Sequence, residues 1–437
     1  MHENREPLTD AIRVPAGHEI ETAVDGSATA PNEPTIRRAA AIFIFFTVAL
    51  DMLALGMIVP VLPRLIGDFT HGDMAKTAQM LGVFGSMFAA IQFFFSPVLG
   101  ALSDRFGRRP VVLLSNMGLG LDYLLMAWAP AMAWLFLGRA ISGLTASSVP
   151  TAMAYMTDVT PEQKRAAAFG MVNAAFGMGF VLGPAVGGML GNVNPRLPFW
   201  VAAVLSIVNA LYGTFILPES LAPQYRNPFS WKRANPVGSV SLLRRSEILT
   251  GLAGTLLMAY ITQQSLTVYV IYADYRYHWS DRKVGLSLAV VGLIAGLYAA
   301  ILVKKAVKKI GERGALLLGL AGGTVGLVIF GFSASGWLFC LAIPVFNLIT
   351  LAWPSAQSMM SQQAGPAEQG QLQGAINSLR GIAGLIGPSL FSYIFSKSIG
   401  AHAIVDLPGS PFFLAAAILL ASLIVAARVT PRPAAPI

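Results

Sequence analysis

The chain has 437 residues, of which 55% are hydrophobic and only 12% are charged, and its mean hydropathy is +0.63. This composition is too apolar and too poor in charge for a soluble globular protein, and it indicates an integral membrane protein. The net charge of +9 does not predict a nucleic-acid partner, because the basic residues gather in alternate loops between apolar segments, as in membrane proteins.

The N-terminal 38 residues are polar and contain no apolar stretch typical of a signal peptide, so we expect residues 1–38 to form a disordered tail. Apolar segments long enough to cross a bilayer then recur as far as residue 428. No alternating pattern suggests a barrel, so these segments predict helices. The twelve predicted helices are 39–66, 77–101, 110–129, 132–156, 165–192, 197–217, 247–272, 283–303, 312–332, 335–358, 368–397 and 409–428.

The stretch 218–246 contains four prolines and five basic residues and is the longest connection, so we predict that it links two six-helix bundles, 39–217 and 247–428. Residues 429–437 form a short C-terminal tail. The loops on the linker side carry most of the Lys and Arg residues, which predicts that this side and both termini are cytoplasmic. We expect a monomer in a bacterial-type inner membrane, with the lipid bilayer, protons and a small molecule as partners and with no cofactor or bound metal.

The two halves of the sequence repeat each other at an offset of 204 residues. The pattern Gly170, Asn173, Gly177, Gly183-Pro184 recurs as Gly374, Asn377, Gly381, Gly387-Pro388. The same offset relates Gly107 to Gly311, Arg109 to Arg313 and Gly118 to Gly322. Duplicated bundles with a site at their interface are typical of secondary transporters. The sequence contains no phosphate-binding loop, so we expect no ATP-driven mechanism.

Several motifs resemble a known family. The loop from Gly100 to Arg109 resembles the signature loop of the major facilitator superfamily, and the glycines from Gly170 to Gly188 match its antiporter motif. Further stretches are similar to the bacterial tetracycline:proton exporters. They are Leu50-Asp51 with Pro60-Val-Leu-Pro63, Ser103 to Pro110, Leu121-Asp122-Tyr123, Gly138-Arg139 with Ser142-Gly143, and Gln369-Gly370 with Leu372-Gln373-Gly374. The resemblance implies a twelve-helix fold that exports a drug in exchange for protons by alternating access.

The charged loop is expected to act as a conformational latch between the halves. Gly100 would allow tight packing at a helix end, Gly107 would permit a turn, and Asp104 would face arginines or helix N-termini. The alternative is that the arginines only fix topology. The predicted latch residues are Gly100, Asp104, Arg105, Gly107, Arg108 and Arg109.

The antiporter motif places small residues on one helix face. The spacing of Gly179, Gly183 and Gly187 removes side chains from that face, and Pro184 adds a bend. We expect this smooth face to let the two halves close against each other. The motif residues are Gly170, Gly179, Gly183, Pro184, Gly187 and Gly188.

Charges inside predicted helices indicate function, because each costs about 3 kcal/mol at the bilayer centre on insertion scales. A carboxyl group in apolar surroundings favours its neutral form and can load and release a proton. Asp51 and Asp122 are therefore candidate proton carriers, and Arg139 is the candidate counter-charge. The alternative for Asp51 is a static partnership with Arg139 or another polar group.

Polar residues in the predicted helices are candidates for a substrate cavity, although buried amides also join helices. These residues are Gln92, Asn173, Gln263, Gln264, Asn347, Gln357, Asn377 and Arg380.

The resemblance to the tetracycline exporters fails in the second half. Those exporters carry a coupling histidine and a coupling aspartate where this chain has Ala295 and Gly323. A metal–tetracycline chelate favours carboxylate or imidazole partners, so the departure argues against tetracycline as the substrate. We predict proton-driven export of a small amphiphilic compound. The alternatives are a proton-coupled uptake symporter and a membrane sensor that transports nothing.

Overall fold

The computed structural model describes residues 33–161, 164–226, 228, 238–365, 368–400, 403 and 406–429. Within these ranges the chain is helical and contains no strand. Most of the two predicted tails and the middle of the predicted linker lie outside the described residues, so the domain boundaries remain predictions.

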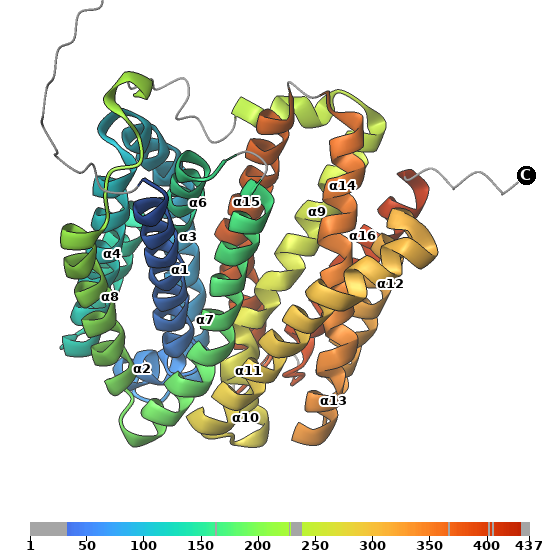
Figure 1. Cartoon of the computed structure of the whole chain (residues 1–437). Coiled ribbons are helices and arrows are strands. Elements are labelled where there is room, and N and C mark those ends of the chain that lie inside the picture. Colours follow the sequence, from blue (N-terminus) through green and yellow to red (C-terminus); the bar gives the residue numbers. More distant parts are fainter. Residues whose placement is uncertain are drawn as a thin grey trace, which may run out of the picture.

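The helices form two groups that stand side by side (Figure 1). The first group contains α1 (Glu33–Ile58), α2 (Leu62–Phe69), α3 (Met74–Phe106), α4 (Arg108–Trp128), α5 (Met132–Thr145), α6 (Ser148–Val159), α7 (Arg165–Val193) and α8 (Leu197–Ile216). The second contains α9 (Glu247–Gln263), η4 (Gln264–Val268), α10 (Tyr269–Tyr277), α11 (Asp281–Leu297), η5 (Tyr298–Leu302), α12 (Val303–Phe332), α13 (Gly336–Phe346), η6 (Asn347–Leu351), α14 (Ala352–Gln363), α15 (Gln369–Lys397) and α16 (Ser410–Val429). Two short helices, η2 (Pro223–Tyr225) and η3 (Gly238–Arg244), lie in the predicted linker.

These helices make up twelve membrane spans. Eight described stretches are long and apolar enough to cross a membrane. One of them, Asp281–Phe332, holds two spans, because Gly311 adopts a φ of 71° within it and turns the chain. The remaining three spans are α5 with α6, α9 with α10, and α15, which are either interrupted or polar. The predicted twelve-helix fold is therefore confirmed.

Several predicted helices are interrupted in the structure. The first ends at Ile58, and the short helix α2 follows with Pro63 in its first turn, where a missing N–H is tolerated. The predicted helix 132–156 breaks at Ala146-Ser147, and a 3₁₀ segment interrupts each of 247–272 and 335–358. Hydropathy predicted these spans as continuous, because it reports the length of an apolar run and not its local backbone geometry.

The repeat is visible in the backbone. Gly107 has a φ of 111° and Gly311 a φ of 71°, so both glycines make the turn that residues with side chains rarely adopt. The break at Ser147 has its counterpart in η6, which ends at Leu351, 204 residues further on. The duplicated sequence therefore builds two bundles with matching turns and breaks.

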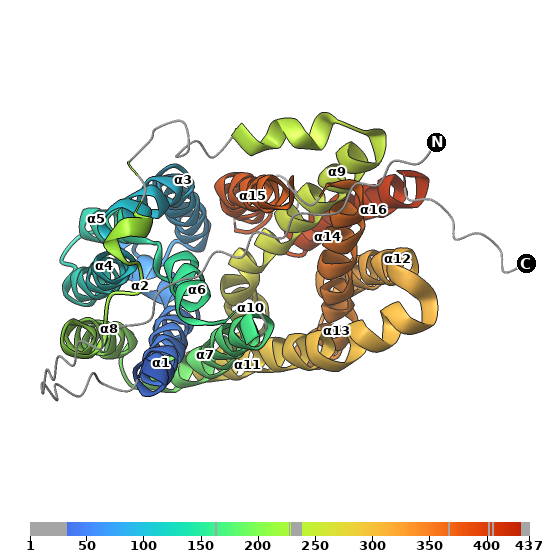
Figure 2. The ribbon, with the colours of Figure 1, turned by 45° about the horizontal axis from the view of Figure 1, so that its top comes forward.

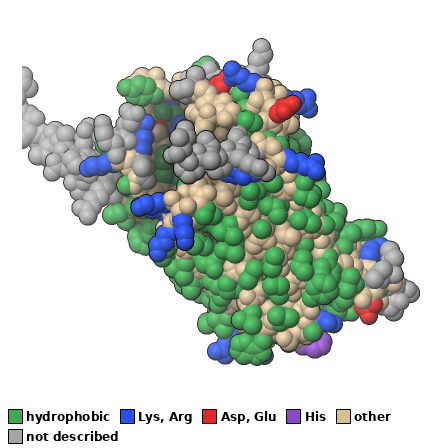
Figure 3. Space-filling view, turned by 90° about the vertical axis from the view of Figure 1, so that its right-hand side faces the viewer, with side chains coloured by type: hydrophobic (Ala, Val, Ile, Leu, Met, Phe, Trp, Pro, Cys, Tyr) green, Lys and Arg blue, Asp and Glu red, His purple; other side chains and the backbone are tan. Residues whose placement is uncertain are grey.

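The two bundles meet along two helix pairs, α3 with α15 and α7 with α11 (Figures 1 and 2). Figure 3 shows the outer face of the molecule on which α12 lies. Hydrophobic side chains cover the middle of this face, and the Lys and Arg side chains on it lie mainly toward one end. We call the end that carries the loop between α3 and α4 the basic face. This distribution suits a bundle surrounded by lipid with polar ends in water.

Candidate functional site: buried charges and an open interface

A buried ion pair lies inside the N-terminal bundle. The Arg139 guanidinium on α5 donates to the Asp122 carboxylate on α4, and the two residues are only 6% and 0% exposed. The guanidinium carbon lies 5.1 Å from the ring centre of Phe88, a contact that favours the cation. An added Cβ at Gly138 would lie 2.6 Å from an Asp122 carboxylate oxygen, so this glycine allows the two helices to approach.

Asp51 belongs to a separate buried cluster that joins α1, α4 and α8. With the Asn116 amide oriented to satisfy both of its polar atoms, its nitrogen donates to Asp51 Oδ2 at 3.1 Å. The Asn116 oxygen accepts from Asn209 Nδ2 at 2.9 Å, and Thr47 donates to Asn209 Oδ1 at 3.3 Å. The structure therefore gives Asp51 a polar partner, Asn116, whereas Arg139 forms its ion pair with Asp122.

The loop between α3 and α4 holds its charges within one bundle. Arg108 forms ion pairs with Asp104 and with Asp158, whose Oδ2 lies 3.2 Å from Arg108 Nε. The Glu219 carboxylate accepts from the backbone N–H of Arg108 at 2.8 Å and from that of Arg109 at 3.3 Å. Glu219 therefore caps α4, where the positive end of the helix dipole favours an anion.

Asp104 faces an arginine as expected, because it pairs with Arg108, and in this conformation that contact stays inside the N-terminal bundle. The role of the loop as a latch between the halves stays a prediction. An added Cβ at Gly100 would meet no atom within 4 Å, so no neighbouring helix requires a glycine there. The Arg105 guanidinium lies over the Phe106 ring at 5.1 Å and not in an ion pair of the described residues. Gly107 makes the turn as predicted, and Glu219 fills the space beside it.

The glycine face of α7 packs inside the bundle, contrary to expectation. Added Cβ atoms at Gly179, Gly183 and Gly187 would lie within 2.0–2.7 Å of α1 atoms. The halves instead meet through the next position, Gly188, whose Cβ would lie 2.4 Å from the Asp281 carbonyl on α11. The spacing identified the smooth face correctly but not the helix that covers it.

The bundles are closed at the end opposite the basic face. There Arg64 pairs with Asp281 across the interface at 3.0 Å, and Gln79 donates to Ser396 at 3.1 Å. The close contacts between α3 and α15 continue as far as Phe93 on α3. An added Cβ at Gly381 on α15 would lie 2.3 Å from the Phe93 ring.

Nearer the basic face the bundles part. Added Cβ atoms would meet no atom within 4 Å at four glycines there: Gly170, Gly177, Gly296 and Gly370. Gly170, the first glycine of the antiporter motif, thus faces open space. The structure is therefore open toward the basic face and closed at the other.

Three of the predicted cavity residues reach this open space. Asn173 on α7 and Asn377 and Arg380 on α15 are exposed although they lie within membrane-spanning helices. Arg380 Nη2 donates to the Tyr260 hydroxyl at 3.5 Å, and Gln357 Nε2 donates to the same oxygen at 3.3 Å. Arg380 and Gln357 thus come together around Tyr260, a residue that the sequence did not single out.

The other predicted cavity residues are less open. Gln92, Gln263 and Gln264 are half-buried, and an added Cβ at Gly387 would lie 2.3 Å from Gln264 Cβ. Asn347 is 3% exposed and donates to the Ile343 carbonyl of the preceding helix, α13, at 2.9 Å, so it does not line the open space.

A major facilitator superfamily model matches residues 44–388, which is most of the chain. The chain belongs to this superfamily. It is 38% identical over 363 residues to the class C tetracycline resistance protein of Escherichia coli, covering 82% of this chain and 90% of that protein. The class B tetracycline resistance protein of Escherichia coli is 36% identical over 360 residues, covering 80% of this chain and 87% of that protein. The solved nucleoside transporter NupG superposes with a TM-score of 0.73 at 13% identity, over 90% of this chain and 98% of that one, which supports the fold.

The position of Gly323 is closely packed in the second bundle. An added Cβ there would lie 2.8 Å from Leu419 Cδ2 on α16 and 3.1 Å from Ile349 Cβ. This position on α12 is therefore filled by helix packing and leaves no room for an acid without rearrangement. Ala295 on α11 is half-buried.

Several residues of the site were not predicted. Asn116 and Asn209 are amides in otherwise apolar segments, which is a usable signal. Glu219 and Asp158 lie at the ends of spans and resemble ordinary loop acids, so only their contacts identify them. The same holds for the pair between Arg64 and Asp281.

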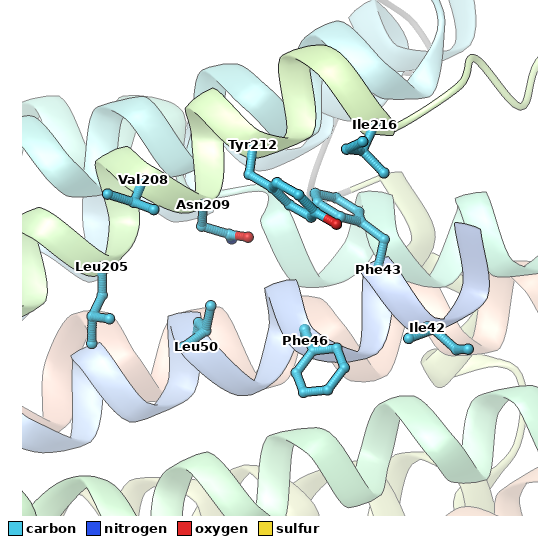
Figure 4. A pocket seen from close by; sticks show the side chains of 9 residues that line it. All are labelled: Ile42, Phe43, Phe46, Leu50, Leu205, Val208, Asn209, Tyr212 and Ile216. Atoms are coloured by element: carbon cyan, nitrogen blue, oxygen red, sulfur yellow. The ribbon is translucent and has the colours of Figure 1, made fainter. Parts of the chain in front are cut away.

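A hollow of about 450 Å³ lies in the N-terminal bundle, between α1 and α8 (Figure 4). Its wall is apolar except for Asn209 and Tyr212. Because Asn209 also bonds to Asn116, only two amides separate this hollow from Asp51.

Proposed function

We propose that this chain is a proton-driven exporter in a cytoplasmic membrane, with its basic face and both termini on the cytoplasmic side. The concentration of Lys and Arg at one end supports this orientation. The duplicated bundles enclose the site within one chain, which supports a monomer as the working unit.

One observation carries the proposal: the interface is open at the basic face and closed at the other, while two carboxyl groups lie buried within the N-terminal bundle. An exporter must take up its substrate from the cytoplasm, and this conformation exposes Asn173, Asn377 and Arg380 to that side. The relatives that are 36–38% identical are named as tetracycline resistance proteins, which favours drug export over metabolite uptake.

These contacts support the following transport cycle. A proton from outside neutralises Asp51 or Asp122, and the bundles then reorient after the substrate has left. Protonation of Asp122 must disrupt its ion pair with Arg139, whereas a protonated Asp51 can still bond to the Asn116 amide. We therefore assign the proton to Asp51. The membrane potential supplies about 2.3 kcal/mol per charge per 100 mV, so one proton per cycle is a sufficient drive.

Tetracycline is the first compound to test because of the relatives' names. The chain lacks the acid and the imidazole that a metal–tetracycline chelate favours at Gly323 and Ala295. We therefore propose a different small amphiphilic compound as the main substrate.

Reconstitution into liposomes separates the alternatives. A pH gradient is imposed across the membrane, and the movement of candidate drugs, including tetracycline, is followed. Movement opposite to the protons is the expected result. Movement with the protons would show a symporter, and a protein that binds compounds without moving any would be a sensor.

A further inference from the structure

Arg380 is a cation in the open interface that has no acidic partner among the described residues. The ion pairs of the described chain involve Arg64, Lys76, Arg108, Arg139 and Arg245. The acids of the second bundle lie at or near helix ends, away from the middle of α15. A guanidinium inside a membrane-spanning segment is costly unless water or an anion accompanies it. The arrangement therefore leaves a place for an anion.

The Arg380 side chain is held in position from one side. Its guanidinium carbon lies 5.2 Å from the centre of the Tyr260 ring, and its Nη2 donates to the Tyr260 hydroxyl. Tyr260 is only 3% exposed and stacks on Trp353 with an angle of 15° between the rings. The stacked rings of Tyr260 and Trp353 therefore fix the plane of the guanidinium, while Arg380 itself stays exposed.

Arg380 lies where the two bundles part. Gly381, the next residue, makes the close approach to Phe93 of the other bundle. Asn377 and Gln373, one and two helical turns nearer the basic face, are exposed on the same side of α15. A molecule entering from the basic face would pass these amides and meet the guanidinium at the end of the opening.

We propose that Arg380 binds an anionic group of the transported compound, so that the substrates are amphiphiles bearing a carboxylate or a similar anion. This inference rests on the proposed transport function. The planar guanidinium can donate two parallel hydrogen bonds to a carboxylate, and Asn377 and Gln357 supply amide donors nearby. The exchange of one such anion for one proton moves two charge equivalents inward per cycle, so transport should respond to membrane potential without a pH gradient.

Binding to the purified full-length protein in detergent tests the proposal. The probes are 2-naphthoate and its neutral analogue 2-naphthamide, measured by equilibrium dialysis. The wild-type protein should prefer the naphthoate, and Arg380→Gln should weaken naphthoate binding by about tenfold or more while leaving naphthamide binding unchanged. Arg380→Lys keeps the charge without the planar fork and should give an intermediate loss.

Lys397→Gln is the matched control, because it removes a positive charge from the end of the same helix, where Lys397 lies over the Tyr393 ring. It should bind naphthoate as the wild type does. Equal binding of the two probes by the wild type, no naphthoate binding at all, or an unchanged affinity in both Arg380 variants would overturn the proposal. A monodisperse gel-filtration profile of each variant confirms that it is folded.

The liposome assay distinguishes this inference from the proposed function. If neutral compounds are exported against protons without preference for the anion, the exporter stands and the anion site is wrong. If naphthoate binds at Arg380 but nothing moves against a proton gradient, the anion site stands and the exporter is wrong.

Discussion

The two bundles share a backbone plan but differ in where they keep charge. The N-terminal bundle buries Asp51, Asp122 and Arg139 and gives each of them a polar partner. The C-terminal bundle holds Arg380, which is exposed to the interface and rests on Tyr260. Duplication alone would have produced equal halves, so the difference suggests a division of labour: the first bundle handles the proton and the second the substrate.

The largest expected effect comes from breaking the buried pair of the first bundle. Arg139→Gln leaves the Asp122 carboxylate buried without its cation, which should lower the free energy of unfolding by about 3–5 kcal/mol. Denaturation of the purified protein in detergent measures it. The double variant Arg139→Gln with Asp122→Asn should recover most of the loss.

Arg380→Gln provides the comparison from the second bundle. Because Arg380 is exposed and has no acidic partner among the described residues, its loss should destabilise the protein far less than Arg139→Gln. Equal destabilisation by the two substitutions would remove the distinction between the bundles.

Asn116→Leu should have the next largest effect. It removes the donor to Asp51 and the acceptor for Asn209 while it keeps the branching of the side chain. The unsatisfied groups should lower the free energy of unfolding by about 1–3 kcal/mol. The pH dependence of transport should also shift, because Asp51 loses a bond. An unchanged stability together with an unchanged pH profile would show that the cluster does not hold Asp51.

Glu219→Gln tests the basic face of the first bundle, where this acid caps the helix after the turn. The position 204 residues further on is Leu423. The substitution should destabilise the start of α4 by roughly 0.3–1 kcal/mol. Hydrogen exchange at Arg108 and Arg109 measures this loss. Glu247→Gln, at the start of α9, is the control and should leave exchange in α4 as it is.

Arg64→Gln should have the smallest effect. Its ion pair with Asp281 joins the bundles, but the Arg64 side chain is 55% exposed, so the pair contributes about 1 kcal/mol or less. The equilibrium between the conformation open at the basic face and the conformation open at the opposite end should shift away from the former by at most about fivefold. A cysteine introduced at position 377, in a Cys340→Ser background, is exposed in the basic-face-open conformation. Its labelling should therefore be slower in Arg64→Gln than in the protein that keeps Arg64.

The local pair between Lys76 and Asp73 is the control for Arg64. Lys76→Gln leaves the contacts between the bundles in place, so labelling at position 377 should keep its wild-type rate. Slower labelling in both variants would mean that the Arg64 pair has no special role at the interface.

The spans were predictable because length and hydropathy report them directly, and the repeat predicted the paired turns at Gly107 and Gly311. The helix breaks at Ser147 and η6 were missed because packing decides them. The sequence identified Asp122 and Arg139 as rare charges, but not which carboxylate Arg139 would pair with. Periodicity showed that Gly179, Gly183 and Gly187 share a face, but not that α1 covers it.

The most direct test separates proton movement from substrate movement in liposomes. Proton flux driven by a substrate gradient is followed with an internal pH dye, and exchange of labelled substrate at equilibrium is followed in parallel. Asp51→Asn should abolish the proton flux and retain the exchange, because the second bundle still binds substrate. A full proton flux in Asp51→Asn would contradict the assignment of the proton to the first bundle through Asp51.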